Sequence, residues 1–364
     1  MLYVESPIGV GFSCSNTRSD YLRWNDTQAA KYNLIFLINW LEEFPNYKDF
    51  DLFLTGESYA GHYIPQLAGL LIEYNKNPNI KLIKLRAIAL GNPLLDLDIS
   101  VQVGDYLWLH GAISNETLML KKSICNDSEY LHEDIHGILS QGCKDVFNRA
   151  SNEFSADVAH DDLLLPNCLS SSSTEQFRPK GKHGKIHAMV YTMVRGTRGD
   201  PCLDGRVFTY LNKPQVQKAM HANITHLPSH WNFCIRPLEY QEDNLDMNLI
   251  PLISDLIEAG IPIVLYSGDQ DSKIPLTQTR IIANNLVKDL KLSPFTKYGT
   301  WYDKKQLGGW SQSFVGLKEG KNVTFLTYAL VRGAAHEVPF TSPSQALTLF
   351  PSFPSGTPLP RPNE

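Results

Sequence analysis

Short apolar runs alternate along this chain with segments of helical periodicity. The runs that have the length of buried strands lie at 52–55, 86–90, 262–266 and 323–331. Apolar residues recur at helical spacing over 62–74, between the first two runs, and 276–290 is compatible with a helix between the last two. Strands that alternate with helices indicate an α/β fold with a mostly parallel sheet.

The alternation is interrupted between the second run and the third. Residues 95–233 contain four of the six cysteines, a serine-rich stretch at 170–174 and a basic tract at 178–185. This texture is typical of an inserted segment with a long loop. We therefore expect a first part of the core at 1–94, an inserted cap at 95–233 and a second part of the core at 234–364. Residues 2–4, Leu-Tyr-Val, also have the character of a strand.

Composition limits the class of protein. The chain has 364 residues, of which 43% are hydrophobic and 20% charged. This length has room for one large α/β domain, and the composition excludes a disordered chain or a coiled coil. The net charge is −5 and the basic residues are scattered, which argues against nucleic acid as a partner. No apolar run has the length of a membrane span, so we expect a soluble protein without a membrane partner.

Cysteines and glycosylation sequons indicate an oxidising compartment. The six cysteines show no C-x-x-C spacing, which favours disulfides over a metal site. N-x-S/T sequons, the acceptor pattern for N-glycosylation, occur at Asn25, Asn115, Asn126, Asn223 and Asn322. The residues after Met1, however, lack the basic region and the apolar core that make up a signal peptide.

One serine lies where a nucleophile would stand. The stretch 56–61, Gly-Glu-Ser-Tyr-Ala-Gly, follows an apolar run and precedes a helical segment, so Ser58 is placed at a strand–turn–helix corner. The pattern departs from G-x-S-x-G because Ala60 holds the second glycine position, and alanine is the next smallest residue. The backbone N–H of Tyr59, directly after the serine, would donate a hydrogen bond to an oxyanion.

A serine nucleophile needs a base and a third group that orients this base. In this type of fold the acid and then the histidine follow the serine along the chain. Asp269 and Asp271 come directly after the third apolar run, and His336 comes directly after the fourth. Both places are carboxyl ends of strands, where open α/β sheets gather their active sites. Spacing does not choose between the two aspartates.

Several segments together resemble the serine carboxypeptidases, particularly the plant serine carboxypeptidase-like proteins. They are 2–13, 56–63, 91–93, 267–271 and 332–339, and the resemblance extends from residue 2 to about 360. It implies an α/β-hydrolase fold with a cap that contains disulfides, a triad of Ser58, Asp271 and His336, and no cofactor or metal. The implied substrates are C-termini of peptides or proteins, and the implied location is secreted or vacuolar. The oligomeric state stays open, with a homodimer as one option.

The resemblance also implies roles outside the triad. A carboxylate beside the nucleophile would repel an oxyanion, but Glu57 would bind a substrate's terminal carboxylate if the two groups shared one proton, which favours acidic pH. Glu337 resembles a residue that lines the side-chain subsites, where it would favour basic substrates. The implied disulfides are Cys125–Cys143 and Cys168–Cys202.

The family places a Gly-rich segment and an asparagine upstream of the strand that corresponds to residues 2–4. Neither is present in this chain, and Cys234 loses its usual partner. We therefore expect a chain that is truncated relative to the family, lacks the N-terminal strands of the sheet and contains one of two oxyanion donors. The activity of such a chain is uncertain, so an inactive truncated relative is one alternative.

Two enzymatic alternatives remain. Some family members transfer acyl groups from glucose esters, but their elbow usually carries Asp where this chain has Glu57, which favours hydrolysis. The segment 132–136 matches H-E-x-x-H, so His132 and His136 could make a zinc metalloprotease with Glu153 as third ligand. Because Gly137 follows at once and no long amphipathic helix surrounds the motif, this is the remote reading.

Overall fold

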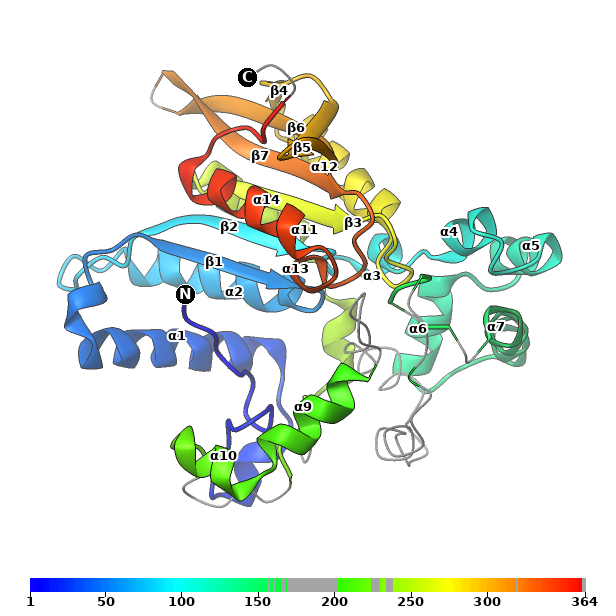
Figure 1. Cartoon of the computed structure of the whole chain (residues 1–364), viewed down its shortest axis with the longest axis horizontal. Coiled ribbons are helices and arrows are strands. Elements are labelled where there is room, and N and C mark those ends of the chain that lie inside the picture. Colours follow the sequence, from blue (N-terminus) through cyan, green and yellow to red (C-terminus); the bar gives the residue numbers. More distant parts are fainter. Residues whose placement is uncertain are drawn as a thin grey trace.

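A computed structural model describes residues 1–155, 158–159, 161–164, 168, 202–223, 230–233, 238–318 and 320–361. One sheet, with the strand order β1-β2-β3-β7-β6-β4 and with β5 paired to β6, runs through this part of the chain (Figure 1). Its strands are β1 (Leu52–Glu57), β2 (Leu85–Gly91), β3 (Ile263–Gly268), β4 (Ser293–Pro294), β5 (Gly299–Asp303), β6 (Gln306–Lys318) and β7 (Lys321–Val331).

Thirteen α-helices and three short 3₁₀ helices are described. The α-helices are α1 (Asp26–Glu43), α2 (Ala60–Tyr74), α3 (Leu97–Ser100), α4 (Gly104–Leu109), α5 (Asn115–Ser123), α6 (Asp127–Ile135), α7 (Gln141–Phe154), α9 (Leu203–Leu211), α10 (Pro214–Ala219), α11 (Ile250–Glu258), α12 (Leu276–Asp289), α13 (Val338–Thr341) and α14 (Pro343–Ser355). The 3₁₀ helices are η1 (Arg18–Tyr21), η2 (Pro45–Tyr47) and η3 (Glu242–Asp246).

The first four strands in the sheet order, β1, β2, β3 and β7, are parallel, and β6 then adds antiparallel pairs to β7, β4 and β5. These parallel strands contain the four apolar runs, so the expected α/β architecture with a mostly parallel sheet is confirmed. Strand β6 has no continuous apolar run because glycines at 308, 309 and 316 and polar residues at 311–313 interrupt it, which explains why periodicity does not reveal it.

Both faces of the sheet are covered because alternate side chains of each buried strand point to opposite sides. In β2, Ile88 and Leu90 belong to a core formed with α2, α11 and α12, whereas Ala87 and Ala89 belong to a core formed with α13 and α14. Burial of a side chain such as Leu90 stabilises the fold by about 1.5–3 kcal/mol. The small alanines allow α14 to pack close to the sheet (Figure 1).

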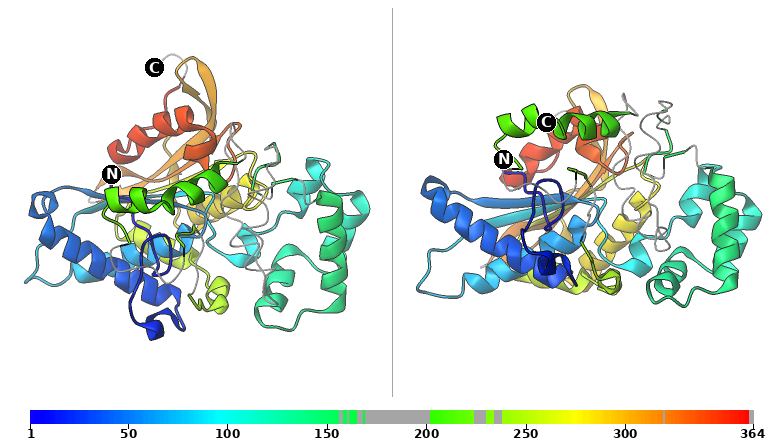
Figure 2. Two further views of the ribbon diagram at one scale, coloured as in Figure 1. Left: turned by 60° about the horizontal axis from the view of Figure 1, so that its bottom comes forward. Right: turned by 90° about the horizontal axis from the view of Figure 1, so that it is seen from below.

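A long helical segment separates β2 from β3. Helices α4 to α7 lie beyond one end of the sheet in every view (Figures 1 and 2). Both implied disulfides are confirmed: the Cα atoms are 5.1 Å apart in Cys125–Cys143 and 4.9 Å apart in Cys168–Cys202. The serine-rich stretch, the basic tract and Cys234 lie outside the described residues. The exact limits of the cap stay a prediction.

A buried ion pair joins four elements of this helical segment. Lys121 Nζ of α5 lies 2.6 Å from Asp127 Oδ1 of α6, and the two side chains are 4% and 3% exposed. Asp127 Oδ2 accepts the backbone N–H groups of Val103 and Gly104 at 3.2 and 3.1 Å, at the start of α4. The ammonium also lies 3.9 Å from the ring centroid of Phe147 in α7. The two backbone N–H groups and the Phe147 ring therefore offset part of the cost of burying this charge pair.

Residues 2–4 are not a strand, which corrects the expectation from their apolar pattern. Their side chains are exposed, and Tyr3 retains 85% of its accessible surface. An extended segment becomes a strand only when a neighbour satisfies its backbone, and the described chain provides no such pairing for residues 2–4. None of the described helices combines the length and the apolar composition that a membrane-spanning helix requires.

Candidate active site

Ser58 lies at a strained corner between β1 and α2. Its φ of 59° is in the left-handed region, which non-glycine residues adopt at a cost and which recurs at functional sites. Backbone bonds hold this conformation: the Ser58 N–H donates to Gly91 O at 2.9 Å, and Ser58 O accepts the N–H groups of Gly61 and Leu94, each at 3.0 Å. The predicted strand–turn–helix elbow is therefore present.

Small residues make this corner sterically allowed. A Cβ atom on Gly56 would lie 2.4 Å from the Cβ of Ala60, so a methyl group at residue 60 fits only because residue 56 is glycine. A Cβ atom on Gly61 would lie 2.2 Å from Leu94 O, which is rigid backbone. Alanine therefore replaces glycine at residue 60 without loss of the elbow.

His336 and Asp271 form a buried pair. His336 Nδ1 lies 2.7 Å from Asp271 Oδ2, and the side chains are 1% and 0% exposed. Asp271 Oδ1 accepts the backbone N–H groups of Lys273 and Ile274 at 2.7 and 3.2 Å, which fixes the carboxylate. Because the carboxylate accepts a hydrogen bond from the Nδ1–H, Nε2 is left as the basic nitrogen. Nε2 is buried and has no hydrogen-bond partner among the described residues.

The Asp269 carboxylate has other hydrogen-bond partners than that of Asp271. Its Oδ1 accepts the Gly333 N–H at 2.6 Å and the Gln270 side-chain amide at 3.1 Å, and its backbone oxygen accepts the Tyr106 hydroxyl at 3.0 Å. It therefore shapes the loop that carries Asp271. The geometry separates the two aspartates that spacing alone left equivalent.

Asn92, directly after β2, ties the loop of Asp271 to the sheet. Its side chain is buried, with Oδ1 accepting the Gly268 N–H at 3.0 Å and Nδ2 donating to Ile274 O at 3.3 Å. The backbone N–H of His336 donates to Asp161 O at 3.2 Å, so the helical segment also contacts the histidine loop. The sequence marks Asn92 as part of a turn and of a segment that carries the resemblance, but it predicts neither of these contacts.

A second buried carboxylate, Asp26, holds the residue that follows the serine. Asp26 is fully buried, and its carboxylate accepts the hydroxyl of Tyr59 at 3.1 Å and that of Tyr240. His62 Nδ1 lies 2.7 Å from the same carboxylate, and its ring stacks on Tyr59 with centroids 4.7 Å apart. Sequence reasoning missed this network, because an aspartate at the first residue of a helix ordinarily reads as a favourable helix-dipole interaction.

Two further carboxyl groups, Glu57 and Glu337, lie close to the triad in the chain. Glu57 Oε1 accepts the Tyr266 hydroxyl at 3.2 Å and the Val338 N–H at 3.1 Å. Burial, and secondly the charge of Glu337, raise the pKa of Glu57 to about 8. Burial raises the pKa of Glu337 to about 7, against the opposing effect of His336. In acidic solution both groups are therefore neutral and able to donate a hydrogen bond.

The five sequon asparagines occupy different environments. Asn25 and Asn126 are helix N-caps that accept the N–H groups of Gln28 and Glu129, each at 2.9 Å. Asn223 donates to Gln217 at 2.8 Å. Asn115 and Asn322 are exposed, and glycosylation at any of the five stays a prediction.

The H-E-x-x-H segment differs from the expectation in its third ligand. His132 and His136 lie together with Asp246. Glu153 is elsewhere: its carboxylate accepts hydrogen bonds from Ser114 and Thr117, so it is not available to the two histidines. The contact with Asp246 depends on tertiary structure, because η3 lies far from α6 in the sequence.

Comparisons with known proteins agree with one another. A family model described as serine carboxypeptidase matches residues 1–356. The chain is 40% identical to serine carboxypeptidase-like 44 of Arabidopsis thaliana over 99% of this chain and 72% of that protein, and 36% identical to serine carboxypeptidase 24 of the same plant over 99% and 73%. A solved structure of KEX1(delta)P, a prohormone-processing carboxypeptidase from Saccharomyces cerevisiae, aligns with a TM-score of 0.63 at 20% identity and covers 99% of this chain and 74% of that chain.

Proposed function

Because this chain belongs to the serine carboxypeptidase family, we propose that it removes C-terminal residues from peptides or proteins with a triad of Ser58, His336 and Asp271. The observation that carries this proposal is the buried contact of 2.7 Å between His336 Nδ1 and Asp271 Oδ2. These two residues follow β7 and β3, and Ser58 follows β1, so all three lie at the carboxyl edge of one parallel sheet.

The chemistry assigns one task to each group. His336 Nε2 takes the proton of Ser58 Oγ while this oxygen attacks the scissile carbonyl, and Asp271 stabilises the imidazolium that results. The Tyr59 N–H donates to the oxyanion. The imidazolium then gives its proton to the leaving amine, and a water molecule, activated by the same histidine, hydrolyses the acyl-enzyme. Asn92 and Asp26 position the acid loop and Tyr59, respectively.

Glu57 supplies the preference for a C-terminus. Its Oε1 accepts two hydrogen bonds, which leaves Oε2 to carry the proton that a substrate carboxylate accepts. Glu337 lies beside His336 in the chain and contributes to the pocket for a substrate side chain.

The two disulfides support a secreted or vacuolar location, because such bonds persist in oxidising compartments.

The Glu57→Gln variant is expected to lose most of the pH dependence of substrate binding. In the wild type, Glu57 donates a hydrogen bond while it is protonated and repels the substrate carboxylate once it is charged. KM for a blocked dipeptide should therefore rise as the pH rises through about 8. A glutamine stays neutral, so its KM should change less over the same range.

The blocked dipeptide amide is the matched control, because it lacks the carboxylate. Wild type and Glu57→Gln should show parallel KM profiles with the amide. Equal slopes for the two enzymes with the free-acid dipeptide would contradict the role of Glu57.

Hydrolysis and acyl transfer are distinguished by substrate. We expect the protein to release the C-terminal amino acid from a blocked dipeptide, detected by mass spectrometry. An acylglucose with an acceptor alcohol should give little transfer product. Turnover of the acylglucose alone would overturn the proposal.

A further inference from the structure

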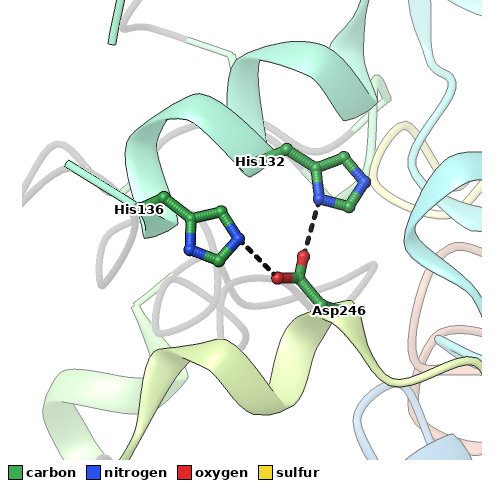
Figure 3. Close-up of side chains that lie close together, drawn as sticks. All are labelled: His132, His136 and Asp246. Carbon is green, nitrogen blue, oxygen red and sulfur yellow. Dashed lines mark ion pairs between the residues drawn. The ribbon is translucent and has the colours of Figure 1, made fainter. Parts of the chain in front are cut away.

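Two histidines and one aspartate converge on a site outside the triad (Figure 3). His132 belongs to α6, His136 is the C-cap of this helix, and Asp246 is the last residue of η3. His132 Nδ1 lies 2.6 Å from Asp246 Oδ1, and His136 Nε2 lies 2.7 Å from Asp246 Oδ2. The side chains of His132, His136 and Asp246 are 36%, 51% and 28% exposed, so an ion can enter from solvent.

The second nitrogen of His132 has a partner of its own. His132 Nε2 lies 3.0 Å from Asp98 Oδ1, and the Ser128 hydroxyl donates to the same oxygen at 2.7 Å. A carboxylate on one imidazole nitrogen fixes the tautomer and directs the lone pair of the other nitrogen outward. Histidines that bind metals are almost always oriented in this way. Asp98 therefore turns Nδ1 of His132 into a directed ligand atom.

We propose that His132 Nδ1, His136 Nε2 and a carboxylate oxygen of Asp246 bind one Zn²⁺ ion, with water in the fourth position. Imidazole nitrogen and carboxylate oxygen are zinc ligands at about 2.0–2.2 Å, which places neighbouring ligands of a tetrahedron roughly 3.4 Å apart. The three ligand groups already lie within 4.8 Å of one another. Shifts of less than about 1 Å therefore suffice to form the site.

The role of this ion is structural. The glutamate of the H-E-x-x-H pattern would have to activate a metal-bound water in a zinc protease. Glu133 Oε2 instead accepts the backbone N–H of Ser140 at 2.7 Å, at the start of α7. The ion would clamp α6 to η3, which precedes α11 of the core, and would stabilise the folded state by mass action.

Zinc binding to the whole protein tests the proposal. After treatment with a chelator and buffer exchange, titration calorimetry with Zn²⁺ should give saturable uptake by this site, and Co²⁺ should give the visible bands of four-coordinate cobalt. His136→Ala and Asp246→Asn should remove both signals. Asp98→Asn should weaken zinc binding roughly 10- to 100-fold, because it removes only the group that orients His132.

The matched control is His110→Ala, which removes an exposed histidine of the same helical segment and should leave zinc affinity unchanged. Circular dichroism should confirm that each variant is folded, and His136→Gln replaces His136→Ala if that variant is not. Chelator should lower the Tm of the zinc-loaded wild type and leave its rate of dipeptide hydrolysis unchanged. No uptake by the wild type, or equal uptake by the His136 and Asp246 variants, would overturn the site; loss of hydrolysis with chelator would overturn the structural role.

Discussion

Replacement of Asp271 by asparagine is expected to lower kcat for a blocked dipeptide about 10⁴-fold. The amide can still accept the N–H groups of Lys273 and Ile274, so the loop keeps its shape. It carries no charge to stabilise the imidazolium of His336, and it can donate to Nδ1, which would place the histidine proton on Nε2. The variant should therefore fold normally and fail in the chemical step.

Asp269→Asn is the matched control, because it makes the same replacement of a carboxylate by an amide at a neighbouring residue. The amide of this variant can still accept the backbone N–H of Gly333, so the loop should keep its shape and most activity should remain. Steady-state kinetics and urea unfolding of both variants provide the comparison. Equal losses of kcat in the two variants would contradict the assignment of Asp271 as the triad acid.

Lys121→Ala is expected to lower the free energy of unfolding by about 3–5 kcal/mol. The substitution leaves the carboxylate of Asp127 buried at 3% exposure without its ammonium partner. It also removes the charge from the face of Phe147. The loss should appear in equilibrium urea unfolding followed by far-UV circular dichroism.

The adjacent residue provides the control for this substitution. Lys122 Nζ lies 2.6 Å from Asp105 Oδ1, which is the same distance as in the buried pair. The side chains of Lys122 and Asp105, however, are 52% and 63% exposed. Lys122→Ala should therefore cost about 0–1 kcal/mol. Similar losses for Lys121→Ala and Lys122→Ala would show that burial does not control the strength of this pair.

The parallel part of the fold could be predicted from sequence because its strands are buried on both faces. Ile88 and Ala87 both face a core, so β2 reads as one continuous apolar run. Strand β6 could not be found in this way because glycines and the polar residues 311–313 interrupt its apolar residues. One of these glycines, Gly308, leaves room for the ring of Trp301 in β5. Residues 2–4 have an apolar pattern without a strand, because pattern alone does not supply a paired neighbour.

The candidate site could be proposed from sequence where chain order carries information. Ser58 and His336 occupy fixed slots after their strands, whereas the choice between Asp269 and Asp271 depends on which carboxylate faces the imidazole. The contacts of Asp26 join residues far apart in the chain, so no local sequence pattern predicts them. The H-E-x-x-H spacing of His132 and His136 left a metal site as a remote reading, and only the folded chain places Asp246 beside the two histidines.

Labelling with a serine-directed phosphonate tests the proposed nucleophile most directly. We predict that the wild-type protein takes up one phosphonyl group on Ser58, located by peptide mass spectrometry, and thereby loses its ability to release the C-terminal residue of a blocked dipeptide. Ser58→Ala should be neither labelled nor active. Hydrolysis of the dipeptide that survives labelling, or that persists in Ser58→Ala, would contradict the account.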